Sequence, residues 1–237
     1  MASKVLRIGL LLIIACCASA AADADGPKPD TEGFVPIFNG RDMTGWEGKP
    51  GWWKVEDGAL TSESTPEKPC KKCNYLMWRD GKAADFELKL KYRIIGGNSG
   101  VQFRSRELPD WDIAGYQADL DAPGQWTGCL YDVNTGRAAV SMRGQKTVID
   151  PDGKKQITNV ADSKELGKVV KKNDWNQYHV IARGSHILLK INGVLMTEVT
   201  DNEKGKASKE GIFAFQMHPG PPMKVQFKDI RLKRMKD

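Results

Sequence analysis

A run of strictly alternating apolar and polar residues, DFELKLKYRII at 85–95, is the clearest structural signal in this chain. Phe86 and every second residue up to Ile94 are apolar, whereas Glu87 and every second residue up to Arg93 are charged. A period of two residues is typical of a β-strand with one buried face. We therefore expect a strand whose charged face is turned toward solvent, on the outer, convex side of a sheet.

Similar short segments follow one another along the chain, separated by turns rich in Gly, Asn and Asp. Two strands joined by a polar loop are expected within 96–121, and Asn192-Gly193 is a strong hairpin signal. Further strands are expected at 52–55, 59–61, 126–133, 138–149, 175–183, 186–191, 194–199, 211–218 and 223–235. The segment 151–172 is interpreted as an irregular excursion with a short helix near 162–166. Many short strands predict an all-β fold, a two-sheet antiparallel jelly-roll β-sandwich.

The polar positions within 96–121 fall on one face of each expected strand. They are Gln102, Arg104 and Arg106 in the first strand and Gln117, Asp119 and Asp121 in the second. A later strand places Gln216 and His218 together on one face. This collection of amides, guanidiniums and carboxylates predicts a polar cleft. The alternative is a salt-bridged outer face, in which Arg104 and Asp119 form a cross-strand ion pair of about 0.2–1 kcal/mol.

Length and composition are those of one soluble globular domain. The chain has 237 residues, of which 40% are hydrophobic and 28% are charged. It can bury one sizeable core, so we expect a single domain at 34–236. The net charge is +6, and because Lys4 and Arg7 lie in a segment expected to be removed, the mature value is 6 − 2 = +4. Lys and Arg recur between apolar residues, as in ELKLKYR and FKDIRLKR, rather than in long runs, which argues against nucleic acid as a partner.

Residues 1–20 have the composition of a secretory signal peptide. Basic residues precede an apolar run at 8–15, and an A-x-A cleavage site ends at Ala20. Alternatively, the residues before Cys16 resemble a bacterial lipobox, which would leave a lipid anchor on that cysteine. The apolar run is too short to span a bilayer. We expect a flexible leader at 21–33 and export to the periplasm or the extracellular space.

Three cysteines remain after the expected signal peptide. Cys70 and Cys73 stand in one Pro- and Lys-rich loop, and in an oxidising compartment this spacing predicts a small disulfide between them. A structural zinc site needs four Cys or His ligands, and the chain has no second C-x-x-C motif. We expect no cofactor, although the sequence leaves a divalent cation open, together with the pairing of Cys129 and the oligomeric state.

The three histidines have structural interpretations as well as functional ones. His218 directly precedes Pro219 and either caps the end of a strand or takes part in chemistry. His179 and His186 fall in strands crowded with apolar residues and are expected to be structural.

Several motifs together resemble those of the 3-keto-disaccharide hydrolase family of exported bacterial proteins. The resemblance covers about 33–233. The motifs are Phe38-Asn39-Gly40 with Gly45-Trp46, DFELKLKYRIIGGNSGVQFRSR at 85–106, Gly115-Tyr116-Gln117-Ala118-Asp119, Asp174-Trp175-Asn176, Ile191-Asn192-Gly193 and VQFKDIR at 225–231. The resemblance implies the jelly roll of concanavalin A-like lectins and laminarinase-type glucanases, with a concave sugar-binding face.

The activity that the resemblance implies is cleavage of glycosides already oxidised at C3 of the sugar. A ketone at C3 acidifies the C2 proton, so a base removes that proton and the C1 aglycone leaves by elimination, after which water can add. The implied roles are Asp119 as the base, Arg104 as the stabiliser of the enolate oxygen and His218 as the acid or a second base. The expected substrate-binding residues are Gln102, Arg106, Gln117, Asp121, Gln216 and Trp126.

The glucanase pattern itself is not complete in this chain. Gln117-x-Asp119-x-Asp121 has a spacing similar to that of the glucanase acids but carries an amide in the first position. This departure argues against ordinary two-carboxylate hydrolysis. The alternative function is a non-catalytic carbohydrate-binding or adhesive module, because one fold serves both classes. The Trp cluster from Trp46 to Trp53 is then either a sugar-stacking platform or a cap on the core.

Overall fold

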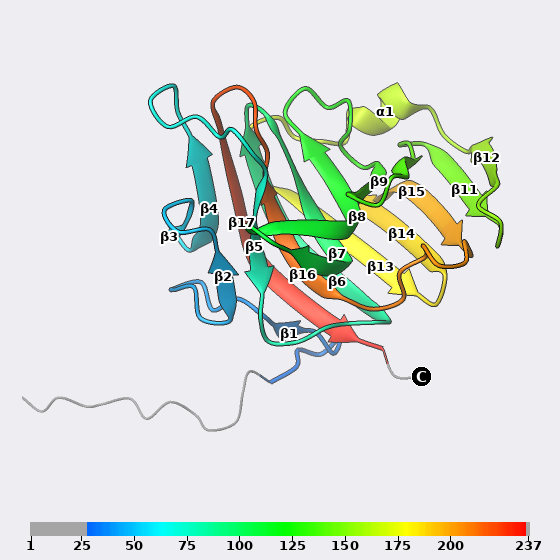
Figure 1. Cartoon of the computed structure of the whole chain (residues 1–237), viewed down its shortest axis with the longest axis horizontal. Coiled ribbons are helices and arrows are strands. Elements are labelled where there is room, and N and C mark those ends of the chain that lie inside the picture. The colour runs from blue at the N-terminus through cyan, green and yellow to red at the C-terminus, as the bar shows by residue number, and fades with distance from the viewer. Residues whose placement is uncertain (1–27, 236–237) are drawn as a thin grey trace, which may run out of the picture.

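Two curved β-sheets packed face to face make up the protein in its computed structural model, which describes residues 28–235 (Figure 1). The strands of the larger sheet are β1 (Val35–Pro36), β3 (Trp53–Glu56), β4 (Ala59–Ser64), β6 (Phe86–Ile95), β11 (Gln145–Ile149), β12 (Lys155–Asn159), β13 (Asn176–Arg183), β14 (His186–Ile191), β15 (Val194–Asp201) and β17 (Met223–Arg234). The strands of the smaller sheet are β2 (Trp46–Gly48), β5 (Asn74–Trp78), β7 (Asn98–Leu108), β8 (Asp112–Asp121), β9 (Leu130–Val133), β10 (Ala138–Ser141) and β16 (Ile212–Met217). One short helix, α1 (Ser163–Gly167), confirms the helix expected near 162–166. The expected signal peptide and the lipobox at Cys16 lie outside the described residues.

The strand order of each sheet confirms the predicted all-β, two-sheet fold. The larger sheet has the order β12-β11-β15-β14-β13-β6-β17-β4-β3, with β1 paired to β17. The smaller sheet has the order β10-β9-β8-β7-β16-β5-β2. Between the described strands, every pairing is antiparallel except that of β11 with β15, where 146–149 run parallel to 198–201. Figure 1 shows β11 and β12 together at one edge of the sandwich.

The two sheets bury their apolar faces against each other. The rings of Phe215 and Phe227, which come from opposite sheets, stack with their centroids 4.0 Å apart. Trp46 also stacks on Phe215, at 5.0 Å. Trp53 is 9% exposed and donates a hydrogen bond from Nε1 to Asn74. Trp46 and Trp53 therefore pack in the core and do not form a sugar-stacking platform.

Most expected strands are present, and the differences have local causes. The strand expected at 138–149 is two strands, β10 and β11, because the chain turns at Gly144 and passes from one sheet to the other. β5 was not expected because both of its faces are covered, with Leu76 in the main core and Tyr75 in a second apolar cluster, so it shows no alternation. β12 lies within the expected excursion at 151–172, and all its residues are exposed. In residues 28–235 no helix is long and apolar enough to cross a membrane.

The outer face of β6 is only partly open to solvent, whereas the whole charged face was expected to be turned toward solvent. Lys91 is exposed, but Lys89 is half-buried. Lys89 Nζ pairs with the carboxylate of Glu32 at 2.5 Å and lies 4.2 Å from the ring centroid of Phe34, which is itself buried. The segment 30–34 thus covers one part of the charged face that was expected to be bare.

Charge reversal should separate the covered and the open parts of this face. Lys89→Glu should lower the free energy of unfolding by about 1–2 kcal/mol, since it replaces an ion pair and a cation–π contact by repulsion with Glu32. Lys91→Glu is the matched control and should change it by less than about 0.5 kcal/mol, because Lys91 and its partner Asp229 are each 49% exposed. Urea denaturation measures both values. Equal effects would show that 30–34 does not cover β6.

Candidate functional site

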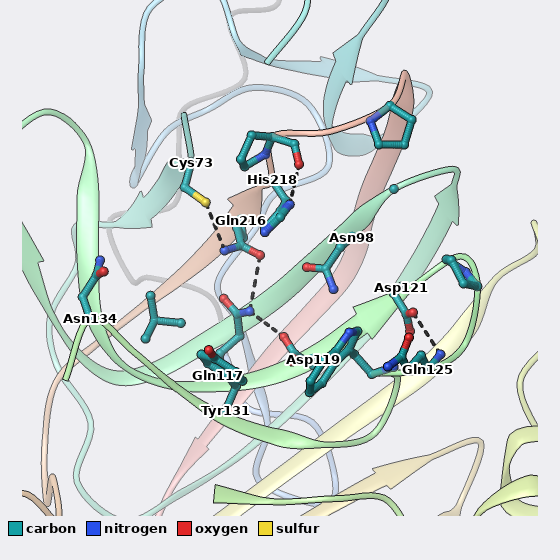
Figure 2. Close-up of a pocket in the computed structure, with 16 residues that line it drawn as sticks. Cys73, Asn98, Gln117, Asp119, Asp121, Gln125, Tyr131, Asn134, Gln216 and His218 are labelled. Atoms are coloured by element: carbon teal, nitrogen blue, oxygen red, sulfur yellow. Dashed lines mark hydrogen bonds between the residues drawn. The ribbon is translucent and has the colours of Figure 1, made fainter. Parts of the chain in front are cut away.

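A cavity of about 620 Å³ with polar side chains in its floor opens on the outer face of the smaller sheet, the face turned away from the larger sheet (Figure 2). Its floor is formed by side chains of β7, β8 and β16, one wall comes from β9, and the loops at 121–126 and 218–221 form the rim. Gln117, Asp119 and Gln216 lie in the floor because alternation along β8 and β16 turns these positions outward. The cavity thus lies where the sequence indicated a polar cleft.

Three glutamines on adjacent strands form a chain of amide hydrogen bonds along the floor. Gln102 of β7 donates from Nε2 to Oε1 of Gln117 at 2.7 Å. Gln117 donates from Nε2 to Asp119 Oδ1 at 2.5 Å and to Gln216 Oε1 at 3.3 Å, as Figure 2 shows. Gln216 in turn donates to the hydroxyl of Tyr75 at 2.8 Å. Because the oxygen and the nitrogen of each amide are both engaged, the chain fixes Gln117 and, through it, the carboxyl of Asp119.

A glycine leaves the space that Gln117 occupies. Gly100 of β7 lies opposite Asp119 in the ladder between β7 and β8. A Cβ atom at position 100 would lie 2.2 Å from Cδ of Gln117, which is far inside van der Waals contact. Gln117 can therefore cross to its partners only because the neighbouring strand has no side chain at this point.

Asp119 is a carboxyl residue of the cavity floor and is 4% exposed. Burial raises the pKa of Asp119 to about 8, the hydrogen bond from Gln117 opposes the rise, and the charge of Asp121 adds to it. A carboxyl that titrates near neutral pH can exchange a proton with a bound molecule under ordinary conditions. Asp119 therefore has both the position and the proton affinity of a general acid or base.

His218 lies at the rim, directly after β16, and half of it is shielded from solvent. Its Nδ1 is 2.6 Å from the carbonyl oxygen of Pro219. Since a carbonyl oxygen only accepts hydrogen bonds, Nδ1 carries the proton of the neutral ring and Nε2 keeps a lone pair. The bond to Pro219 agrees with the capping interpretation, and the remaining lone pair leaves the ring able to accept a proton.

Asp121 lines the cavity, but its carboxylate binds the loop that follows it. It accepts hydrogen bonds from the backbone N–H groups of Gln125, Trp126 and Thr127 and from the Thr127 hydroxyl, all at 2.8–2.9 Å. These bonds fix the loop that carries Trp126, whose ring meets that of Tyr131 edge-on at 6.2 Å. The two rings form an aromatic wall, which Asp121 positions through its loop, while its expected role as a direct ligand of the sugar stays a prediction.

The prediction that Arg104 and Arg106 share the polar face with Gln102 is wrong. β7 contains a bulge between Phe103 and Arg106, and the φ angle of Arg104 is 47°. The bulge interrupts the alternation, so Ser105 turns to the face of Gln102 and donates to its Oε1 at 2.8 Å. Arg106 is exposed to solvent outside the cavity, and Gln102 is fully buried beneath Gln117 rather than open to a ligand.

Arg104 ties together loops at the end of the sandwich. Its guanidinium is 1% exposed and donates to the carbonyl oxygens of Ala84 and Gly184 at 2.7 Å each and to Oδ1 of Asp85 at 2.9 Å. Burial lowers the pKa of Arg104, and the charge of Asp85 opposes this. Arg104 is therefore a structural residue and is not placed to stabilise an enolate in the cavity.

The predicted disulfide is absent, since Cys70 and Cys73 are free thiols, as is Cys129. Cys70 packs in the main core, whereas Cys73 lies on the cavity side, where Gln216 donates to its Sγ at 3.6 Å. The two thiols thus lie in different surroundings, one among the core residues and one beside Gln216. Burial raises the pKa of Cys73 to about 11, so this thiol is neutral at ordinary pH.

The other two histidines, His179 and His186, have structural partners. His179 pairs with Glu87 at 2.9 Å and His186 with Glu198 at 3.0 Å, in agreement with their structural interpretation. Within 28–235, no group of three or more His, Cys, Asp or Glu side chains is arranged to hold a metal ion.

The sequence interpretation did not single out Asn98, Tyr131 and Tyr75. Asn98 and Tyr131 line the cavity, and Tyr75 closes the amide chain. Asn98 has the same parity along β7 as Gln102, so alternation alone could have found it. Tyr131 depends on the pairing of β9 with β8, which places it opposite Gln117, and no local pattern reports such a register.

The fold and the site together define a jelly-roll protein of the glycosyl hydrolase-like or carbohydrate-binding class. Residues 33–233 match the family of the 3-keto-alpha-glucoside-1,2-lyase-like domain, and the chain belongs to this family. The match confirms the resemblance drawn from the motifs.

Individual relatives are distant. The 3-keto-disaccharide hydrolase of Bacteroides thetaiotaomicron is 27% identical over 101 residues, which are 36% of this chain and 32% of that protein. The match thus spans about a third of that relative's length. A crystal structure of a presumed glycosyl hydrolase from Parabacteroides distasonis has a TM-score of 0.58 at 19% identity, over 85% of this chain and 99% of the other. The carbohydrate-binding module CBM66 from Bacillus subtilis has a TM-score of 0.54 at 17% identity, over 81% of this chain and 96% of the other. At these identities the two structures support the fold alone.

Proposed function

We propose that the cavity binds a carbohydrate and that the protein cleaves glycosides oxidised at C3 of the sugar. The observation that carries the proposal is the Asp119 carboxyl, whose pKa burial raises to about 8 at the floor of a cavity of about 620 Å³. A base of this strength suits a C2 proton that an adjacent ketone has acidified. Family membership and the relative named for 3-keto-disaccharide hydrolysis support the same substrate class.

In the proposed reaction, Asp119 removes the proton from C2, and the electrons of that C–H bond move onto the C3 oxygen as an enolate. The enolate then re-forms the C3 carbonyl, and its electrons form a double bond between C1 and C2. The C1–O bond breaks with its electrons on the leaving oxygen, which takes up a proton and departs as an alcohol. Water can then add across the double bond, which completes an overall hydrolysis. The first step needs a donor near the C3 oxygen, and the second needs a proton source near the leaving oxygen.

Side chains other than Arg104 are proposed for these two roles. The amide of Asn98 lines the cavity floor beside β8 and is assigned to the C3 oxygen. His218 is assigned to the leaving oxygen, since Nε2 can take up a proton and deliver it while Nδ1 stays bonded to Pro219. Trp126 is assigned to the apolar face of the sugar ring.

A carbohydrate-binding module without catalysis is the second candidate. The aromatic wall favours it, and CBM66 shows that the same fold occurs in a carbohydrate-binding module. The two candidates differ in what they require of Asp119. An enzyme needs its carboxyl to exchange a proton, whereas a binding module needs only a fixed hydrogen-bonding group.

Incubation of the purified protein with a 3-keto-glycoside and with its unoxidised parent tests the proposal. We expect release of the aglycone from the 3-keto-glycoside only, because the C2 proton of the parent is not acidic. Proton NMR in D₂O follows the loss of the C2 signal and the appearance of the free aglycone together. Saturable binding of both sugars without cleavage would favour the binding module, and equal cleavage of both would contradict the proposed chemistry.

A further inference from the structure

A second, smaller cavity of about 160 Å³ lies behind the loop that forms the rim of the first. Asp121 and Pro123 line both cavities, so this loop separates them. The other side of the smaller cavity is formed by residues from 167–176, which run from the last residue of α1 to the first residue of β13. A cavity of roughly 150 Å³ accommodates a molecule of about six non-hydrogen atoms, such as benzene.

An unpaired hydroxyl belongs to this cavity. Tyr92 of β6 is 1% exposed and lines it, and its OH group has no hydrogen-bond partner among the described residues. Burial raises the pKa of Tyr92, and the charges that act on it are those of Asp121 and Arg143. Since buried hydroxyls are rarely left without a partner, Tyr92 supplies a donor for a molecule bound here.

A guanidinium with one nitrogen that no described residue engages lines the same cavity. Arg143 is 9% exposed and donates from Nε to Ser163 O at 2.9 Å and from Nη1 to Gly124 O at 2.9 Å and Thr127 O at 2.6 Å. Nη2 makes no hydrogen bond to a described residue. It faces Gly167, where a Cβ atom would lie 3.4 Å away, and Gly167 also lines the cavity.

The charges around the cavity favour an anion. Lys171 and Lys172 line it together with Arg143. The opposing carboxylate of Asp121 already accepts four hydrogen bonds from the loop that follows it. Three residues with cationic side chains therefore line the cavity against one carboxylate, most of whose hydrogen bonds come from its own loop.

We propose that the smaller cavity binds a small hydroxycarboxylate anion of the size of lactate. Its carboxylate accepts from Nη2 of Arg143, a charge-assisted bond, and its hydroxyl group pairs with the OH of Tyr92. Lactate has about six non-hydrogen atoms, which matches the available volume. Through Arg143, the bound anion links 167–176 to the loop that carries Trp126, so its occupancy stiffens one wall of the first cavity.

Titration of the whole protein with sodium lactate tests this site, with sodium chloride of equal ionic strength as the reference. Calorimetry should show saturable binding to the wild type and a Kd raised about tenfold or more in Tyr92→Phe and in Gly167→Ala. Tyr92→Phe removes only a hydroxyl group that has no protein partner. Gly167→Ala puts a methyl group beside Nη2 of Arg143, and alanine is more favourable than glycine in a helix. Both variants should therefore keep the Tm of the wild type when no lactate is present.

Three further probes check the chemistry of the ligand. Propionate lacks the hydroxyl group, glycerol lacks the charge, and inorganic phosphate lacks the planar carboxylate, so each should bind more weakly than lactate. The proposal is overturned if lactate does not saturate, if its Kd is unchanged in both variants, or if any of these probes binds as tightly. Since glycoside cleavage is not measured, the result is independent of the proposed function.

Discussion

Asp119→Asn should lower the turnover of a 3-keto-glycoside by about 100- to 10,000-fold. Asparagine keeps the size of the side chain and an acceptor for Gln117, but it cannot take up the C2 proton. The affinity for the sugar should survive, because the aromatic wall of Trp126 and Tyr131 is unchanged. Steady-state kinetics should therefore show a large fall in kcat with little change in KM.

The pH dependence gives a second readout of the same residue. With the pKa of Asp119 raised to about 8, the base is mostly protonated at neutral pH, so kcat/KM should rise with pH through about 8. Stability changes in the opposite direction. Because the folded pKa lies above the ordinary value of 3.8 for an aspartate carboxyl, the stabilisation is complete below about pH 4 and is lost as the pH rises through about 8. Asp119→Asn should remove both dependences.

Asp229→Asn is the matched control for this experiment. Its carboxyl is half exposed on the larger sheet, away from the cavity, and its loss should leave turnover and both pH profiles as in the wild type. If Asp119→Asn keeps full activity, the base must be sought elsewhere, and His218 with its open Nε2 is the next candidate in the cavity.

Arg104→Ala should lower the free energy of unfolding by about 3–5 kcal/mol while the folded protein keeps its kcat. The change removes the guanidinium donor of the carbonyl oxygens of Ala84 and Gly184, and it leaves the carboxylate of Asp85 with the backbone N–H of Gly184. Arg104→Lys keeps the charge, but one ammonium group cannot replace the guanidinium toward all three partners. It should restore only part of the loss.

Urea denaturation together with kinetics distinguishes this structural role from a catalytic one. Arg106→Ala, two residues along the same strand and exposed, is the control and should change stability by no more than about 0.5 kcal/mol. A kcat that falls by about 100-fold in a stably folded Arg104→Ala protein would mean that the guanidinium reaches the substrate. That outcome would contradict the position of Arg104 outside the cavity, which the bulge in β7 produces.

The parts of the site that could be predicted lie where alternation continues without interruption. β8 and β16 keep a period of two over their inner residues, so Gln117, Asp119 and Gln216 were placed correctly on one face. The many short strands predicted the fold class, but they did not predict the order of the strands in either sheet. Which strands become neighbours depends on contacts between residues far apart in the chain, and local patterns do not report these.

The parts that could not be predicted depend on single departures from regular geometry. Arg104 has a positive φ, which is uncommon for a non-glycine residue and has no signal in the sequence around it. Because of the bulge in β7, the side chain of Arg104 lies outside the cavity, and Ser105 takes the face of Gln102. The spacing of Cys70 and Cys73 likewise says nothing about the surroundings of each thiol.

Gly100 offers a criterion for sorting homologous sequences that does not rely on their acids. Any larger residue there would displace Gln117, and with it the hydrogen bond that Asp119 receives. A homologue that carries both an amide at the position of Gln117 and a glycine at the position of Gly100 can build the same floor. A homologue with a bulkier residue at that second position must orient its carboxyl by other means, even where the carboxyl itself aligns.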